Sequence, residues 1–166
     1  MTELARTPPR LQRLFRLIDL APLPQHEVVS EALELWREKR GSGLAAPAAD
    51  VFGAAKHEVL DYGFLAEAVA GADDFAISEA GSRAMGLLGL ERGSWRLSKV
   101  GKRRIAARLR RLFSLVIEYG EPVLVRFVDR KRGFEVLAAP VDTVEGETAI
   151  FCTLALDELS GTQAER

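Results

Sequence analysis

The most marked chemical feature of this sequence is a block of basic residues between positions 99 and 132. The block holds 11 lysines and arginines against three acidic residues, a net charge of +8, whereas the remaining residues sum to −9 and the whole chain to −1. A concentration of positive charge attracts the phosphates of nucleic acids and nucleotides. We therefore predict an anion-binding surface formed by Arg103, Arg104, Arg108 and Arg111.

The same block is also compatible with a purely structural role. Basic helix faces are usually solvated and pair with acidic residues elsewhere, here with those at 27–38 or 73–79. A nucleic-acid partner is further disfavoured because no aromatic residues are interleaved with the arginines and no helix-turn-helix spacing is found. Nucleic-acid or anionic-nucleotide binding through residues 99–111 is therefore the alternative function rather than the main one.

The chain offers few ligands for a metal or cofactor. Its one cysteine, Cys152, and two histidines, His26 and His57, cannot form a four-ligand zinc site without carboxylates. Both histidines precede the first expected strand, which places them outside the wall of a haem pocket. Cys152 lies among apolar residues typical of a buried strand, so a reactive thiol for a flavin adduct is not expected. We predict no metal site and no cofactor.

Residues typical of catalytic motifs are missing as well. The sequence contains no Gly-x-Ser-x-Gly, no phosphate-cradling glycine loop and no His-Glu-x-x-His. Asp73 and Asp74 are adjacent carboxylates, but they lie in an expected turn, where acidic side chains are normally solvated. We therefore predict that the protein is not an enzyme and nominate no catalytic residues.

Length and composition indicate a single globular domain with a short N-terminal appendage. At 166 residues, 48% hydrophobic and 28% charged, the chain is too short for two independent cores and too apolar for disorder. We assign residues 1–24 to the appendage, 25–160 to the domain and 161–166 to a frayed tail. No apolar run is long enough for a bilayer span, and Pro8, Pro9 and Arg10 interrupt a secretory signal, so we expect a cytoplasmic protein.

The appendage is predicted to be an amphipathic helix followed by a proline-rich joint. Its apolar residues recur at helical spacing, with arginines between them. A membrane is one docking surface for such a helix, but about three turns with one aromatic residue bind membranes weakly. We favour packing on the domain or on the same helix of a partner. The predicted dimerisation residues are Leu11, Leu14, Phe15 and Ile18.

Hydrophobic periodicity divides the domain into helices and short strands. Helical spacing is found at 27–39, at 53–61 and most clearly at 105–117, where Gly120 and Pro122 end the helix. Strand-like stretches lie at 63–69, 74–79, 123–128, 133–141 and 147–156. This order predicts an α+β fold with a five-stranded antiparallel sheet and helices on one face.

The order of elements and several local motifs resemble PAS domains. The matching residues are 35–41 (LWREKRG) with Pro47 and Asp50, 75–77 (FAI) with Gly81, and a closing hairpin at 133–141 (GFEVLAAPV) and 150–154 (IFCTL). In these segments the chain is similar to the small bacterial PAS-like proteins of the PAS_5 type, over roughly residues 27–157. The resemblance implies a PAS-like sheet and a sensory or protein-interaction module, with no particular ligand.

In a PAS-like fold the sheet and the long helix enclose a core or a cavity. The predicted ligand-binding residues are Phe75, Ile77, Trp95, Phe113, Val116, Phe127 and Phe151. The alternative is an ordinary hydrophobic core, which is the commoner role of large apolar residues at such positions. We therefore predict a noncatalytic, homodimeric PAS-like regulatory or interaction module, with a signalling protein as partner and an unknown small ligand as its candidate effector.

Overall fold

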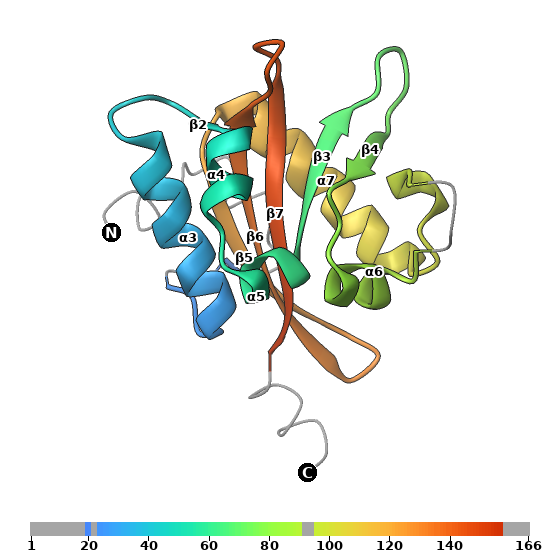
Figure 1. Ribbon diagram of the computed structural model, residues 1–166. Coiled ribbons are helices and arrows are strands. Elements are labelled where there is room, and N and C mark those ends of the chain that lie inside the picture. The colour runs from blue at the N-terminus through green and yellow to red at the C-terminus, as the bar shows by residue number, and fades with distance from the viewer. Residues whose placement is uncertain (1–18, 21–22, 91–94, 158–166) are drawn as a thin grey trace.

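The computed structural model describes residues 19–20, 23–90 and 95–157, and these form an α+β fold (Figure 1). The strands within these residues are β1 (Asp19–Leu20), β2 (Ala46–Pro47), β3 (Gly63–Ala68), β4 (Phe75–Ser78), β5 (Val123–Asp129), β6 (Arg132–Asp142) and β7 (Thr148–Asp157). The helices are α3 (Glu27–Arg40), α4 (Ala48–Ala54), α5 (His57–Asp61), α6 (Ser82–Leu88) and α7 (Arg103–Tyr119), with a short 3-10 helix, η1 (Leu97–Lys99). Strands β3 to β7 and helix α7 are the five strands and the long helix expected from the sequence.

The strands form one open, mixed sheet in the order β1-β5-β6-β7-β3-β4. Neighbours along this order are antiparallel, whereas β2 adds a short parallel pairing to the end of β6, with Ala46 beside Val141. The predicted five-stranded antiparallel sheet therefore describes β3 to β7 but omits β1 and β2. Each of these two strands is only 2 residues long, too short to leave an alternating pattern in the sequence.

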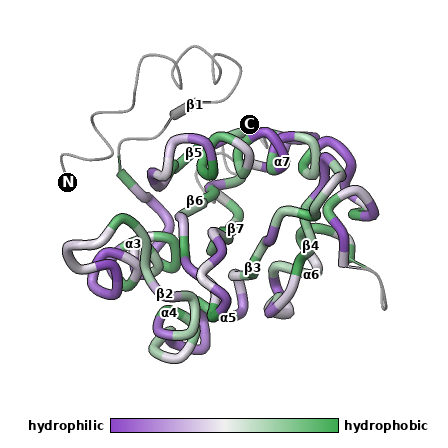
Figure 2. Tube along the Cα trace, turned by 90° about the horizontal axis from the view of Figure 1, so that it is seen from above, coloured by the Kyte–Doolittle hydropathy of each residue, from purple (hydrophilic) through white to green (hydrophobic). Residues whose placement is uncertain are grey.

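Helices cover both faces of the sheet, so the prediction of helices on one face is wrong (Figure 2). Helices α6 and α7 contribute to one hydrophobic cluster, and α3, α4 and α5 contribute to a second. Strand β6 shows the reason, because its residues 133–141 are all buried. A strand covered on both faces is apolar along its length and loses the alternation that distinguishes a one-sided sheet.

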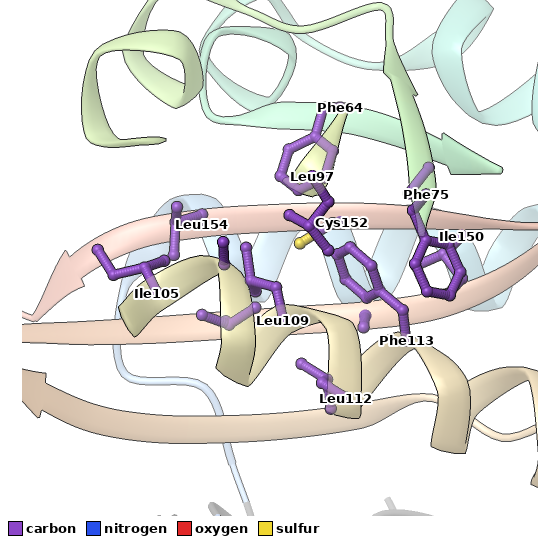
Figure 3. Packing of buried hydrophobic residues seen from close by; sticks show 14 of the residues in the cluster. Phe64, Phe75, Leu97, Ile105, Leu109, Leu112, Phe113, Ile150, Cys152 and Leu154 are labelled. Atoms are coloured by element: carbon purple, nitrogen blue, oxygen red, sulfur yellow. The ribbon is translucent and has the colours of Figure 1, made fainter. Parts of the chain in front are cut away.

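The face beneath α7 is closed by aromatic packing. The Phe113 ring of α7 lies edge-on to Phe64 and Phe75, with ring centroids 5.9 and 5.4 Å apart (Figure 3). Edge-to-face pairs at this distance stabilise a core beyond the area they bury. The helix ends at Gly120, whose φ of 68° is the left-handed conformation typical of a helix C-terminus. The apolar stripe of α7 is thus fixed on the sheet, while its arginines are exposed or half-buried.

The other face is closed by α3, which buries Trp36 completely. The indole Nε1–H donates a hydrogen bond of 2.8 Å to the backbone oxygen of Pro140, so the polar atom of this side chain is satisfied inside the core. Phe151 of β7 and Phe52 of α4 add an edge-to-face pair at 5.5 Å on the same side. The helix predicted at 27–39 therefore packs on the face of the sheet opposite α7.

The predicted N-terminal helix lies outside the described residues, and so do its dimerisation residues Leu11, Leu14, Phe15 and Ile18. The predicted tail at 161–166 is outside them too. The first described residues are Asp19 and Leu20, where β1 pairs with β5 at Arg126 and Val125. Among the helices of the described residues, none is long and apolar enough to cross a bilayer.

Candidate functional site

A hollow with a strongly basic lining lies where the start of α7 meets the turn between β5 and β6. We call it the basic hollow; it encloses about 400 Å³. Its lining residues are Lys102, Arg103, Arg104, Arg130 and Arg132, together with Leu87, Gly101, Ile105, Asp129 and Phe134. Five basic side chains against one carboxylate give this surface a net positive charge.

The basic hollow follows from the way the chain reverses after α7. The helix has 17 residues and spans about 25 Å, while β5 has 7 residues and spans about 23 Å. Because the chain turns back at Gly120, the end of β5 returns to the start of the helix. A hydrogen bond of 3.2 Å from Arg108 Nη1 to the Val128 oxygen joins the two elements near this end.

The turn between β5 and β6 holds two basic residues in an unusual backbone conformation. Arg130 and Lys131 have φ values of 49° and 65°, and Asp129 pairs with Arg132 across them. Two-residue hairpin turns with positive φ strongly favour asparagine and glycine at these positions. A residue with a Cβ pays about 1–2 kcal/mol for this conformation, so the turn keeps two positive charges where the backbone favours other residues.

Among the described residues, the basic side chains of the hollow have no acidic partner. Within the part of the chain that the structure describes, the ion pairs involve none of Lys102, Arg103, Arg104, Arg130 or Arg132. The first turn of α7 contains no acidic residue, and no side chain caps it. A helix N-terminus carries partial positive charge from its backbone N–H groups. The basic side chains and the helix N-terminus therefore favour an anionic ligand.

The four predicted anion-binding residues separate into different environments. Arg103 and Arg104 line the basic hollow. Arg108 lies over the Phe127 ring, with its Cζ atom 4.8 Å from the ring centroid, and also bonds to Val128. Arg111 is exposed further along α7, outside the lining of the hollow.

Sequence reasoning did not select Lys102, Arg130 and Arg132, although it counted all three in the basic block. The signal that identifies them is the antiparallel return of β5, which brings the turn at 130–132 beside the start of α7. The lengths of the expected helix and strand contain this information, because they are nearly equal in ångströms.

The predicted ligand-binding residues do not all share one wall. Phe75, Ile77, Phe113, Val116 and Phe127 belong to the cluster beneath α7, and Trp95 packs against that cluster while half-buried. Placing Phe151 among them was wrong, because it belongs to the cluster on the opposite face. Successive residues of a strand point to opposite faces, so Ile150 and Cys152 face α7 whereas Phe151 faces α3 and α4.

A second charged feature, the Glu135 network, is formed by Leu23, Gln25, His26, Arg126 and Glu135. The side chain of Glu135 is 1% exposed, and its Oε2 lies 2.7 Å from Arg126 Nε. Its two oxygens also accept hydrogen bonds of 2.9 Å from the backbone N–H groups of Gln25 and His26. Arg126 in turn donates to the Leu23 oxygen. The carboxylate therefore fastens the segment before α3 to the middle of the sheet.

The two histidines and Cys152 lie in environments that indicate structural roles. His26 is the N-cap of α3, where its Nδ1 accepts from Val28 N at 3.2 Å, and His57 is exposed with its Nε2 3.7 Å from Asp61. Burial raises the pKa of the Cys152 thiol well above its ordinary value. Within the described residues, no three His, Cys, Asp or Glu side chains are grouped to hold a metal ion.

Asp74 is the second buried carboxylate. Its oxygens accept from the Phe75 backbone N–H at 2.8 Å, from the Ser98 backbone N–H at 3.0 Å and from the Ser98 hydroxyl at 2.6 Å. Burial on its own raises the pKa of Asp74, but these hydrogen bonds, with a contribution from Arg96, bring it below the ordinary value. Asp74 thus holds η1 against the start of β4.

Comparisons of the chain with protein-family models, with curated proteins and with solved structures gave no match.

Proposed function

We propose that the chain is a noncatalytic PAS-like regulatory or protein-interaction module that acts as a homodimer through its N-terminal segment. Two features support a PAS-like arrangement. Strands β3 and β4, which precede α7, and strands β5 to β7, which follow it, lie in one sheet, with β3 directly beside β7. The long α7 also immediately precedes the meander of β5, β6 and β7 and packs on the same sheet.

The observation that carries the proposal is the Glu135 network. It connects residues 23–26 to β5 and β6, which lie side by side in the sheet. In this proposal, a displacement of residues 23–26 acts through these bonds on strands that also form the core. A buried, fully bonded carboxylate transmits such a displacement because breaking its bonds is costly. This gives the N-terminal segment a physical route to the domain.

The core supports input at the surface rather than a large ligand inside. Phe113 fills the space between α7 and the sheet through its contacts with Phe64 and Phe75. The lining of the basic hollow includes neither Phe113 nor Phe75. In this proposal the predicted pocket residues act as core, and partners or effectors act on the outside.

The oligomeric state of the full chain tests the proposal. Native mass spectrometry should show a dimer, and Leu14→Glu and Ile18→Glu should each convert it to a monomer because they place a charge in the apolar stripe. Gln12→Glu adds the same charge beside the stripe and serves as the matched control, which should remain dimeric. A monomeric wild-type chain, or a dimer that survives both stripe variants, contradicts the proposal.

The alternative function, binding of nucleic acid or of an anionic nucleotide, is favoured by a specific observation as well. That observation is the basic hollow, in which Arg103 and Arg104 are joined by basic residues from a distant turn.

A further inference from the structure

We infer that the basic hollow is a binding site for a small phosphorylated molecule, which it holds by a monophosphate or diphosphate group. This inference narrows the anion-binding alternative and does not rest on the proposed regulatory role. Its basis is the convergence of Lys102, Arg103 and Arg104 from one segment with Arg130 and Arg132 from another.

The charge of the hollow favours a counter-charge. Like charges repel, and although water screens this repulsion between exposed side chains, it is not removed entirely. The hollow collects five cations, and its one carboxylate, Asp129, forms no ion pair with them within the described residues. A multiply charged anion removes this repulsion and gains charge-assisted hydrogen bonds from guanidinium groups.

The shape of the hollow selects a compact anion. Its volume of about 400 Å³ lies at the lower end of the range typical of small-molecule sites. The wall also has a small apolar part, in which Leu87 is half-buried whereas Ile105 and Phe134 are each only 2% exposed. A phosphate group meets the basic side, and Leu87 offers the apolar contact for an organic group attached to it.

The strained backbone of the turn between β5 and β6 supports a ligand-binding role for its basic residues. Arg130 and Lys131 occupy left-handed conformations in which Asn-Gly is the usual and less strained choice. Residues in sparsely populated backbone conformations cluster at ligand sites. In this turn the strained positions carry the positive charge itself, and Arg130 lines the hollow.

A small molecule fits the site better than a nucleic-acid strand does. Single strands are bound on exposed aromatic faces along a basic track, but Phe127 and Phe134 are 7% and 2% exposed and stack on each other. Arg108, which lies next along α7, is already engaged with Phe127 and Val128. Arg108 is therefore committed to the strand, whereas five basic side chains converge on the basic hollow.

Isothermal titration calorimetry of the full chain with inorganic pyrophosphate tests the inference. Wild-type protein should bind pyrophosphate more tightly than orthophosphate, and Arg104→Gln and Arg130→Gln should each weaken binding about tenfold, the effect of one charged hydrogen bond. Arg111→Gln is the matched control, because Arg111 is an exposed arginine of the same helix outside the hollow. It should change the affinity less than about twofold, as expected of a charge beyond contact distance.

Three outcomes overturn the inference. The first is the absence of binding heat up to about 10 mM pyrophosphate, because a dissociation constant above that concentration is too weak for a specific site. The second is equal weakening by Arg104→Gln and Arg111→Gln, which means diffuse attraction to the whole helix. The third is tighter binding of a single-stranded DNA oligonucleotide than of pyrophosphate, which indicates a nucleic-acid surface. None of them bears on the dimer test, so failure of this site and failure of the proposed function are distinguishable.

Discussion

The hairpin of β5 and β6 carries two charged regions that are built in opposite ways. In its middle, Arg126 of β5 and Glu135 of β6 lie directly opposite each other. The Glu135 carboxylate is 1% exposed and accepts hydrogen bonds from Arg126 and from two backbone N–H groups. At its turn, a few residues away, Arg130 and Arg132 join Lys102, Arg103 and Arg104 at the start of α7 around the basic hollow. One strand pair thus contains a buried ion pair whose hydrogen bonds are all made, and a cluster of cations without acidic partners among the described residues.

The difference shows how to separate charges that hold the fold from charges available to a ligand. Burial makes an unpaired charge very costly, so the carboxylate of Glu135 persists only because Arg126 and two backbone N–H groups satisfy it. Exposed cations of like sign do not stabilise the fold and are tolerated because water screens them. We therefore expect substitutions in the two regions to change stability by different amounts and with opposite signs.

The largest effect is expected for Glu135→Gln. This change removes the charge that balances Arg126 and one acceptor of the N–H groups before α3, and it should lower the free energy of unfolding by about 3 kcal/mol, the usual cost of breaking a buried pair. The measurement is urea unfolding followed by circular dichroism.

Two further variants show whether that loss comes from the pair. Glu145→Gln changes an exposed carboxylate in the turn after β6 and should leave the unfolding midpoint nearly unchanged. Arg126→Met combined with Glu135→Gln should cost less than the sum of the two single changes, because neither charge is then left alone. Strict additivity is incompatible with the pairing described here.

An intermediate effect is expected for Asp74→Asn, which tests whether a second saturated carboxylate behaves like the first. The folded pKa of Asp74 lies below its value in the unfolded chain, about 3.9. The carboxylate therefore stabilises the fold above that pH, and the contribution is lost as the pH falls through the folded pKa. Asp74→Asn should cost about 1–2 kcal/mol at neutral pH and flatten the acid limb of the stability profile.

The neighbouring residue provides the control for this experiment. Asp73 is exposed, whereas Asp74 is buried against Ser98. Asp73→Asn should leave both the neutral-pH stability and the acid limb close to wild type. If the two variants have the same pH profile, the Ser98 contacts do not determine the behaviour of Asp74.

Much of the fold was accessible from the sequence because single faces leave periodic patterns. The stripe at 105–117 predicted α7, and five short apolar stretches predicted β3 to β7. The second helical face was missed because residues 133–141 are buried on both sides, where alternation disappears. Trp36 was recognised as part of an apolar helix face, but nothing local in the sequence specifies that it contacts Pro140, 104 residues away.

Only part of the candidate site could be predicted from the sequence, for a related reason. Counting charges located the block at 99–132, but it did not divide Arg104, which lines the hollow, from Arg108, which contacts Phe127. That division depends on which side of α7 faces the returning strand. Likewise, Glu135 was read as part of a family motif, and its bonds to Gln25 and His26 depend on tertiary contacts that no local pattern records.

The smallest effect, and the one with the opposite sign, is expected at the basic hollow. In low salt without phosphate, Arg104→Gln and Arg130→Gln should leave stability unchanged or raise it by less than about 1 kcal/mol, because each removes like-charge repulsion at an exposed position. The salt dependence makes this small effect measurable by thermal unfolding. Sodium chloride should stabilise the wild-type protein more than either variant, since screening relieves only repulsion that is still present. A variant that loses stability, or that keeps the full salt response of the wild type, means that these arginines have partners like those of Glu135, and the contrast between the two regions then fails.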